Sequence, residues 1–513
     1  MNSDKILPFE GCEATFAEVR EQGKTIVHCH GTFDLLHFGH IKHLEQAKKL
    51  GEILTVTITA APFVNKGPGR PVFSDEQRAY QLAHLGIVDY VVVVPKPAAV
   101  EIIEKVRPHI YAKGIEYATP KNETDRRIDE DAEAVKRGGG EVQFVGEPLQ
   151  SSSRLIGSHF DTLDPEVREY FESCPTETLS AEIDDAIRKV EKLRVLVIGD
   201  LIMDRYTYCR VQGLTAKTKV LSVRPERDVD QFGGSLAIAR HAASFGCSTK
   251  LIALAGTEPW LDENLARLSD DHLEVNLVRH EDYETIVKQR YVERPGQRRD
   301  LIKYFSVNRL KDDAPPAQQA ALIETLEREL PTCDVVLLCD YGHGMIDAEV
   351  QALLEEKSPY LCMNCQTNSY NYGFNLITKY KKVDLFSLDE RELCLAFGER
   401  KATDFNLLAR LAERLTSKWA WLTLGSSGSV VHTLDHAAHA CPAMVKSTVD
   451  TVGAGDAFFA TVALLSRVGA SVEIASLLGN LAGAMAANIV GNEEPINREA
   501  VVKNARYLLK SVS

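Results

Sequence analysis

The sequence contains no run of about 20 apolar residues, the length that a helix needs to cross a membrane. Its beginning, Met1 to Phe16, also lacks the basic stretch followed by an apolar stretch that marks a secretory signal. Aromatic residues make up only 7% of the chain, whereas 44% is hydrophobic and 26% is charged, which is typical of a globular protein. We therefore expect no membrane partner and a cytoplasmic location.

Basic residues are outnumbered by acidic ones. The chain has 59 Lys and Arg residues against 73 Asp and Glu residues, a formal net charge of −14, and no long block of Lys or Arg. Nucleic-acid binders depend on a basic face, so we expect no nucleic-acid partner. Local basic pockets for phosphates remain compatible with this charge, because net charge does not describe a cleft.

Cysteines are thinly spread and form no disulfide pattern. Eleven is an odd number, which favours reduced thiols over a disulfide framework. One CxxC occurs, Cys362-Met363-Asn364-Cys365, and no second pair accompanies it to complete a zinc site. We interpret both of its cysteines as buried strand residues.

The length of 513 residues predicts more than one domain. Two short apolar segments, Thr25–His28 and Val195–Ile198, each run into a Gly or Asp turn and then a helix, as at the start of α/β units with parallel sheets. We expect domains at residues 1–160 and 193–513, joined by a helical connector at 161–192. In the second domain, β-rich stretches at Tyr206–Val229 and Thr285–Val307 predict a small β lid over a larger α/β body.

The first apolar strand leads into the segment Gly31-Thr32-Phe33-Asp34-Leu35-Leu36-His37-Phe38-Gly39-His40. Two imidazoles at i and i+3, at the start of a helix, share one face with the positive end of the helix dipole. They can there meet the charge that develops when a nucleoside triphosphate is attacked at its α-phosphate. The alternatives are a helix start without chemistry, or a metal site that combines these two histidines with His30 and His43.

This segment resembles the GxFDxxHxGH signature of the nucleotidylyltransferase superfamily. Nearly all of residues 24–157 resembles the nucleotidylyltransferase half of the bifunctional heptose kinase/adenylyltransferases, which implies a Rossmann-like domain. The opening also matches glycerol-phosphate cytidylyltransferases, so the nucleotidyl donor is ATP or CTP. The resemblance implies that His37 and His40 are catalytic and that Gly31, Thr32, Phe33, Asp34, Gly39, Lys66, Arg70, Lys113, Ser151, Ser152 and Ser153 bind nucleotide or phosphate.

A second glycine-rich turn, Asp450-Thr451-Val452-Gly453-Ala454-Gly455-Asp456, precedes the apolar helix Ala457–Leu465. Small residues at a helix N-terminus expose backbone N–H groups to a transferring γ-phosphate, and an aspartate there can accept the proton of a sugar hydroxyl. The alternative is a glycine-rich turn with a capping aspartate. The segment resembles the DTxGAGD signature of the ribokinase (PfkB) family, which implies a ribokinase-like α/β/α fold, ATP as phosphoryl donor and Mg²⁺.

Further motifs follow in the order of that family over roughly residues 193–505, although the order of the two domains is reversed from the heptose enzyme. With Asp456 as the catalytic base, the resemblance implies nucleotide binding by Thr423, Gly425, Gly428, Gly453, Ala454 and Gly455. It implies sugar binding by Asp204, Gly233, Gly234 and Asp340, and a magnesium ion held, directly or through water, by Asp389 and Glu392.

The departures from the family gather on the sugar side of the kinase. Ala237 replaces the asparagine of GGxxxN, and Asn364-Cys365-Gln366 replaces DPK or DPN. Lys217 and Lys219 add two cations to the expected lid, where an i, i+2 pair on a strand faces one side. We expect an active kinase whose acceptor carries extra negative charge but is not heptose 7-phosphate.

The leading hypothesis is a bifunctional sugar-activating enzyme. One half phosphorylates a sugar or sugar phosphate with ATP, and the other transfers a nucleotidyl group to a sugar 1-phosphate, giving a nucleotide sugar of the ADP-heptose type and pyrophosphate. The alternative is a nucleotidylyltransferase whose degenerate kinase-like half regulates or dimerises. A non-catalytic nucleotide sensor would need neither the histidine pair nor Asp456. We expect a homodimer or higher homo-oligomer with sugar phosphates and nucleoside triphosphates as ligands.

Overall fold

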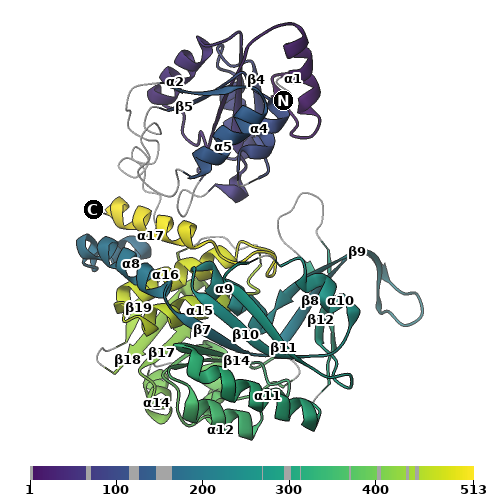
Figure 1. Cartoon of the computed structure of the whole chain (residues 1–513), viewed down its shortest axis with the longest axis vertical. Coiled ribbons are helices and arrows are strands. Elements are labelled where there is room, and N and C mark those ends of the chain that lie inside the picture. The colour runs from purple at the N-terminus through teal and green to yellow at the C-terminus, as the bar shows by residue number, and fades with distance from the viewer. Residues whose placement is uncertain are drawn as a thin grey trace. The chain divides into compact units, whose positions relative to one another are not determined.

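The computed structural model describes residues 4–64, 71–96, 98–114, 126–145, 164–268, 270–293, 302–311, 313–368, 371–400, 406–434, 438–444 and 450–512. By its internal contacts the chain divides into two units, Met1–Asp164 and Pro165–Ser513. Figure 1 shows both units. No helix in the described ranges is both long and apolar enough to span a membrane.

The described part of the first unit is a parallel sheet with helices on both faces. Its strand order is β1-β4-β3-β2-β5-β6, and every neighbouring pair is parallel. The strands are β1 (Ile6–Leu7), β2 (Ile26–Gly31), β3 (Ile53–Thr59), β4 (Tyr90–Val94), β5 (Ile110–Gly114) and β6 (Glu141–Val145). The helices are α1 (Cys12–Glu21), α2 (Phe38–Lys48), α3 (Asp75–Ala83), α4 (Val100–Val106) and α5 (Arg126–Arg137).

Alternate residues of β2 enter different cores, which explains why the strand is apolar without a break. Ile26 packs in a core with residues of α1, α4 and α5, whereas Val27 and Cys29 pack in a second core with α2 and α3. The chain runs from β2 through β3 to β4 in one direction and then crosses to β5 on the other side of β2. Ligands of such sheets bind at the carboxyl ends of the strands at this reversal. The predicted Rossmann-like fold is confirmed, and its reversal point is the loop after β2.

The second unit is built on a mostly parallel sheet of order β11-β10-β7-β14-β15-β16-β17-β18-β19 in the described residues. Only the pairs β17–β18 and β18–β19 in it are antiparallel. The strands are β7 (Arg194–Gly199), β10 (Ser248–Ala255), β11 (Leu273–Arg279), β14 (Val335–Asp340), β15 (Leu361–Cys365), β16 (Leu385–Asp389), β17 (Trp419–Thr423), β18 (Ser429–Thr433) and β19 (His439–Cys441). Cys362 and Cys365 are buried free thiols of β15, as predicted.

The helices of this unit cover its sheet, which explains the continuous apolar strands. They are α7 (Pro165–Glu172), α8 (Thr176–Val190), α9 (Gly234–Ser244), α10 (Pro259–Leu265), α11 (Pro316–Glu329), α12 (Ala348–Lys357), α13 (Glu390–Phe397), α14 (Asn406–Arg414), α15 (Ala454–Arg467), α16 (Val472–Ala486) and α17 (Arg498–Val512).

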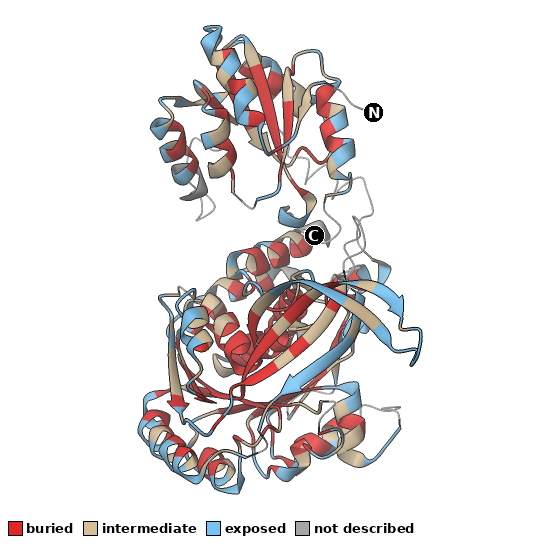
Figure 2. Ribbon diagram, turned by 90° about the vertical axis from the view of Figure 1, so that its right-hand side faces the viewer, coloured by how far each residue is buried: buried red, intermediate tan, exposed pale blue. Residues whose placement is uncertain are grey.

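The predicted β lid is confirmed as a second sheet of order β13-β12-β8-β9. Its strands are β8 (Leu201–Leu214), β9 (Leu221–Gly233), β12 (Ile286–Glu293) and β13 (Ile302–Arg309). Along β8 the residues are buried near the α/β body and become exposed toward the turn into β9, as Figure 2 shows. The lid therefore places the first half of β8, with Asp204, against the body.

The segment expected to be a connector instead packs into the second unit. Its helix α8 lies against α15, α16 and α17 (Figure 1), and α7 lies against α17. Five large apolar side chains of these two helices are at most 6% exposed: Val167, Phe171, Leu179, Ile183 and Val190. Arg498 of α17 donates to Glu191 at 2.6 Å, and Arg506 pairs with Asp184. The unit's core therefore begins at Pro165.

This packing predicts where the chain can be divided. Fragments 1–164 and 165–513 should each fold, whereas a fragment 193–513, which lacks α7 and α8, should be strongly destabilised. Each fully buried side chain of this size contributes about 1.5–3 kcal/mol, so losing five approaches a domain's whole stability of about 5–15 kcal/mol. Thermal unfolding followed by circular dichroism checks this, with the same transition in the intact chain as the reference. Equal melting temperatures for 165–513 and 193–513 would make α7 and α8 a dispensable connector after all.

Candidate active sites

The first candidate site is the loop between β2 and α2, at the reversal point of the first sheet. His37 is the N-cap residue of α2, and its Nδ1 accepts the backbone N–H of Gly39 at 3.0 Å. His40 lies in the first turn of the same helix, with its ring centroid 4.1 Å from that of His37. Since Nδ1 of His37 is an acceptor, its ring proton is on Nε2. The structure thus places both predicted histidines together at the positive end of the helix dipole.

The loop itself is held by buried groups. Phe33 is 6% exposed and has a φ of 46°, and its ring lies 5.2 Å from that of His40. Asp34 is 1% exposed, and its Oδ1 accepts the backbone N–H groups of Val72 and Phe73 at 2.7 and 3.1 Å. Asp34, which we expected to bind nucleotide, therefore fixes the chain after β3 against the loop. Gly31 and Thr32 lie at the end of β2 beside it.

Arg78 of α3, to which the sequence assigned no role, also holds this loop. Its side chain is fully buried and donates to the backbone oxygens of Thr32 and Thr59, at 2.7 and 3.0 Å. It also pairs with Asp75 at 2.6 Å. One guanidinium therefore ties together the segments at the ends of β2 and β3.

A polar cluster lies on β2, β3 and β5 at the same end of the sheet. Thr57 Oγ1 is 2.8 Å from both His28 Nε2 and His30 Nδ1, and Thr59 Oγ1 is 3.2 Å from His30 Nε2. Burial, and then the positive charge of Lys113, lower the pKa of His30 to about 3. The pKa of His28 is lowered by burial, then by His30 and Lys113. Both rings are therefore neutral hydrogen-bonding groups.

Lys113, expected to bind nucleotide or phosphate, lies at the end of β5 and pairs with Asp131 at 3.4 Å. The predicted ligands Lys66, Arg70 and Ser151–Ser153 lie outside the described residues. In the described ranges, no three His, Cys, Asp or Glu side chains are grouped to hold a metal ion. The alternative of a histidine metal site therefore has no support there.

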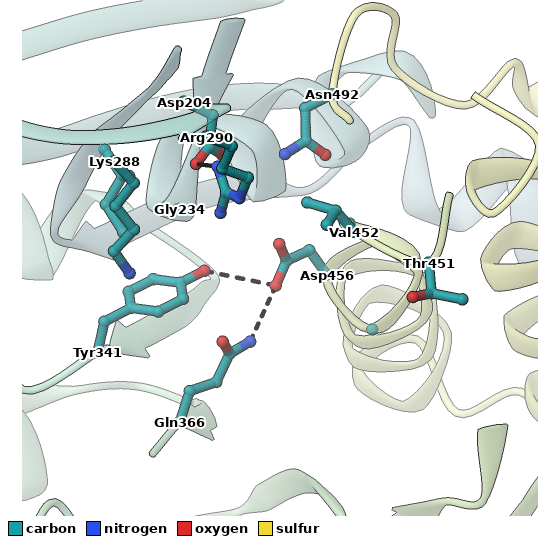
Figure 3. A pocket seen from close by; sticks show the side chains of 13 residues that line it. Asp204, Gly234, Lys288, Arg290, Tyr341, Gln366, Thr451, Val452, Asp456 and Asn492 are labelled. Carbon is teal, nitrogen blue, oxygen red and sulfur yellow. Dashed lines mark hydrogen bonds and ion pairs between the residues drawn. The ribbon is translucent and has the colours of Figure 1, made fainter. Parts of the chain in front are cut away.

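The second candidate site is a pocket of about 270 Å³ between the lid and the start of α15 (Figure 3). Gly453 is the N-cap of α15 with a φ of 85°, and Ala454, Gly455 and Asp456 form its first turn. A Cβ on Gly453 would lie 2.2 Å from Asn492 Oδ1, so the close approach requires glycine. The pocket is lined by Ile202, Asp204, Gly234, Lys288, Arg290, Tyr341, Gln366, Thr451, Val452, Gly453, Gly455, Asp456 and Asn492.

Asp456 is suited to act as a base. It is 9% exposed, and its Oδ1 accepts hydrogen bonds from Gln366 Nε2 at 3.1 Å and Tyr341 Oη at 3.4 Å. Burial raises its pKa to about 6, with Asp204 acting in the same direction and Gln366, Tyr341 and Lys288 opposing it. At neutral pH the carboxylate is mostly ionised and able to take a proton, which is the balance that general-base catalysis requires.

Asp204 and the glycines of the first PfkB-like motif meet at the other side of the pocket. Asp204 is 4% exposed and forms an ion pair with Arg290 of β12. A Cβ on Gly233 would lie 2.1 Å from Asp204 Oδ2, and Gly234 has a φ of 58°. The predicted sugar-side residues Asp204, Gly233 and Gly234 are therefore brought together.

Asp340 does not line the pocket. Its carboxylate is 2.6 Å from both Tyr380 Oη and Lys379 Nζ, and it accepts the backbone N–H of Gly342 at 3.0 Å. It is 1% exposed and stabilises the turn after β14. The neighbouring Tyr341 supplies the pocket contact.

The predicted metal ligands Asp389 and Glu392 form a capping box at the start of α13. Asp389 Oδ1 accepts the N–H of Glu392 at 2.7 Å, and Glu392 Oε2 accepts the N–H of Asp389 at 3.0 Å. Burial, and then Asp389, raise the pKa of Glu392 to about 8, with a further contribution from Asp456. This local excess of carboxylate is suited to a cation that also contacts nucleotide phosphates.

The turn predicted to cover the nucleotide follows β17. Thr423 donates to the carbonyl of Leu388 at 3.3 Å, and Gly425 has a φ of 57°. A Cβ on Gly428 would lie 2.1 Å from the carbonyl of Cys441, so this turn also requires glycine. The described contacts of these residues are structural.

The cations of the pocket are not those predicted. Lys217 and Lys219 are exposed in the turn between β8 and β9, not on a strand, and neither lines the pocket. Lys288 and Arg290 of β12 line it, and as an i, i+2 pair on a strand they share a face. Arg290 pairs with Asp204, whereas Lys288 has no ion pair within the described residues and lies 5.8 Å from the centre of the Tyr341 ring. The i, i+2 pair of cations that was predicted for residues 217 and 219 is thus found at residues 288 and 290 of β12.

Two protein-family models match the chain. The model of pfkB family carbohydrate kinases matches residues 192–497, more than half of the sequence. The chain belongs to the pfkB family of carbohydrate kinases. A cytidylyltransferase-like model matches residues 28–253, which include the loop with His37 and His40. The transferase-like part precedes the kinase part, so the predicted reversal of domain order is confirmed.

Curated relatives of this pfkB family member include several proteins named bifunctional protein HldE. The one from Syntrophotalea carbinolica is 38% identical over 128 residues, 25% of each chain. The one from Koribacter versatilis is 28% identical over 305 residues, 58% of this chain and 60% of its own. The D-beta-D-heptose 7-phosphate kinase of Bordetella bronchiseptica is 26% identical over 308 residues, 59% of this chain and 93% of its own. The match therefore spans a quarter to about 60% of these two HldE proteins.

A solved structure supports the fold of the kinase part. Phosphofructokinase-2 from Escherichia coli is similar with a TM-score of 0.50 at 16% identity, over 62% of this chain and 99% of its own. At this identity the likeness concerns the fold only, and it agrees with the predicted ribokinase-like body.

Proposed function

We propose that this chain is a bifunctional sugar-activating enzyme. Its second unit transfers the γ-phosphoryl group of ATP to a sugar phosphate, and its first unit transfers a nucleotidyl group from ATP or CTP to a sugar 1-phosphate, releasing pyrophosphate. The observation that carries the kinase proposal is Asp456, buried in a pocket at the N-terminus of α15 with a pKa of about 6. A non-catalytic module has no chemical need of such a base, so this observation favours two activities over a degenerate kinase-like half.

The first unit supports nucleotidyl transfer through its histidine pair. His37 Nε2 and the first turn of α2 supply donors to a triphosphate at the reversal point of the sheet. No covalent intermediate is required, because an oxygen of the sugar phosphate attacks the α-phosphate directly. The relatives named HldE and heptose 7-phosphate kinase favour a heptose-like sugar and a nucleotide sugar of the ADP-heptose type.

Mg²⁺ is the cation that the kinase part would use. When bound, it would neutralise negative charge on the nucleotide phosphates. Glu392 is the residue best suited to approach it, directly or through water, with Asp389 beside it on the same helix start. The N–H groups of the Gly453–Asp456 turn would meanwhile face the transferring phosphoryl group.

The ammonium of Lys288 indicates that the acceptor carries a negative charge. An ammonium without a carboxylate partner among the described residues, in a pocket with a base, is suited to a phosphate or carboxylate on the acceptor. Burial lowers the pKa of Lys288, and the carboxylates of Asp204, Asp200 and Asp456 oppose this effect. We propose an acceptor that carries a negative group besides its reacting hydroxyl, and the altered motifs favour one other than heptose 7-phosphate.

A substrate panel tests the proposal. Heptose and hexose phosphates are paired with each nucleoside triphosphate, and ADP and pyrophosphate are measured separately. Lys288→Met should raise the KM of the anionic acceptor about 10- to 100-fold, the value of one charge-assisted hydrogen bond, and leave the KM of ATP unchanged. The double variant Lys217→Ala/Lys219→Ala is the matched control and should behave as wild type. No acceptor-dependent ADP release across the panel would sink the kinase proposal.

The remaining features of the proposal concern assembly and location. We propose that the protein works in the cytoplasm on sugar phosphates and nucleoside triphosphates, without a nucleic-acid or membrane partner. We also propose a homodimer or higher homo-oligomer, which sedimentation of the intact chain would test.

A further inference from the structure

Two hydrogen-bond donors converge on a single oxygen of Asp456. Gln366 Nε2 lies 3.1 Å and Tyr341 Oη lies 3.4 Å from Oδ1 (Figure 3). The second oxygen, Oδ2, points away from both donors, toward the side of the pocket that holds Arg290 and Asn492. The carboxylate is therefore divided into an oxygen that the protein holds and an oxygen that faces the pocket.

Both donors lie at the carboxyl ends of central strands of the sheet. Tyr341 follows β14 and Gln366 follows β15, and these strands are parallel neighbours. Asp456 lies in the first turn of α15. The pairing of two neighbouring strands therefore sets the spacing of the two donors.

The backbone of each donor is itself fixed by asparagine side chains. The carbonyl of Tyr341 accepts Nδ2 of both Asn368 and Asn371 at 2.8 Å. The carbonyl of Gln366 accepts Nδ2 of Asn375 at 3.1 Å. Three asparagines between residues 368 and 375 therefore hold the two donors in place before any ligand binds.

We propose that Gln366 and Tyr341 are positioning residues that hold Asp456 by Oδ1 and leave Oδ2 to accept the proton of the acceptor hydroxyl. This inference rests on the proposed kinase function. In the step concerned, the acceptor oxygen forms a bond to the γ-phosphorus of ATP, and the bond from that phosphorus to the β–γ bridging oxygen breaks. ADP leaves, and the hydroxyl proton passes to Oδ2.

The segment that departs from the family pattern after β15 includes one of these donors, Gln366. Asn364-Cys365-Gln366 stands where the family has DPK or DPN, which in sequence looks like a loss on the sugar side. In the structure Gln366 donates to the base, Asn364 donates to the carbonyl of Ser387 at 3.0 Å, and Cys365 is buried. The substituted segment has its own hydrogen bonds, one of which reaches the reacting group.

The charges around Asp456 determine how the base should respond when a donor is lost. The titratable and charged groups that face it are Asp204 of β8, Lys288 and Arg290 of β12, Cys339 and Tyr341 at the end of β14, and Glu392 of α13. Burial and the carboxylates favour the protonated acid, whereas Gln366, Tyr341 and Lys288 favour the carboxylate. Because the Gln366 donor favours the carboxylate, removing it should raise the pKa of Asp456.

The test measures this pKa in the intact chain by ¹³C NMR of labelled aspartate, with Asp456→Asn to assign the signal. Gln366→Leu should raise the pKa of Asp456 by about one unit, since a hydrogen bond to a charged group is worth about that much. Tyr341→Phe should raise it less, because its bond is longer. In kinase assays the acidic limb of the pH profile should move upward by the same amount, and kcat should fall while the KM of ATP stays constant.

Gln318→Leu is the matched control. Gln318 is 1% exposed and its amide donates to two backbone carbonyls outside the pocket, so its loss should lower stability without moving the pKa of Asp456. An unshifted pKa in both Gln366→Leu and Tyr341→Phe would overturn the inference, as would a lower kcat with an unmoved acidic limb. If the wild type turns over no acceptor, the proposed kinase function fails, while the NMR titration still decides whether Gln366 and Tyr341 hold Asp456 by Oδ1. Should Gln366→Leu not fold, Tyr341→Phe gives the same answer.

Discussion

Asp456→Asn is expected to lower phosphoryl transfer by about 10²- to 10⁴-fold, the usual contribution of a general base. The amide keeps the shape of the side chain and the first turn of α15, but it cannot accept the hydroxyl proton. The affinity for ATP should therefore stay near the wild-type value. ADP release measured with a saturating acceptor, together with ATP binding measured by calorimetry, checks both parts.

Asp347→Asn is the matched control for this change. Asp347 is the exposed N-cap of α12 and accepts the N–H groups of Glu349 and Val350, so asparagine replaces it at a helix start outside the pocket. It should retain full activity. Because the pKa of Asp456 is about 6 and the base must be ionised, wild-type turnover should fall as the pH drops below about 6. Retained turnover in Asp456→Asn would assign the base to another group.

His37→Asn and His40→Ala are each expected to lower nucleotidyl transfer by about 10²- to 10³-fold, as for the loss of one donor to a developing negative charge. Asparagine is chosen at position 37 because it is a good N-cap residue. It keeps α2 capped while removing the Nε2 donor. The phosphoryl transfer of the second unit should be unchanged in both variants. Pyrophosphate release measured with sugar 1-phosphates checks the first effect.

His84→Ala is the control for the histidine pair. His84 caps the end of α3, where its Nδ1 lies 2.8 Å from the carbonyl of Tyr80, away from the loop after β2. It should transfer nucleotidyl groups at the wild-type rate. If His37→Asn were as active as the wild type, this histidine would be a cap and nothing more. A loss of bound zinc in step with activity would instead revive the metal alternative.

The sequence determined those parts of both sites that are contiguous in the chain. A helix N-terminus and the residues of its first turn are placed by local geometry, so His37 and His40 could be located from their spacing before α2. The same holds for Gly453 to Asp456 before α15. Apolar runs bounded by turns likewise predicted the α/β units, because buried parallel strands leave that pattern.

The tertiary structure alone decided which distant side chains meet these local groups. Lys288, Tyr341 and Gln366 come from three separate strands or their ends, and nothing in their sequence spacing relates them to Asp456. In the folded chain the carboxylate of Asp340 bonds to the turn that follows it, at Gly342. Lys217 and Lys219 are exposed at the tip of the β8–β9 hairpin. The physical reason is that strand pairing and lid packing select which face of each strand reaches the pocket. A shift of one residue in register would reverse that choice without altering the motifs.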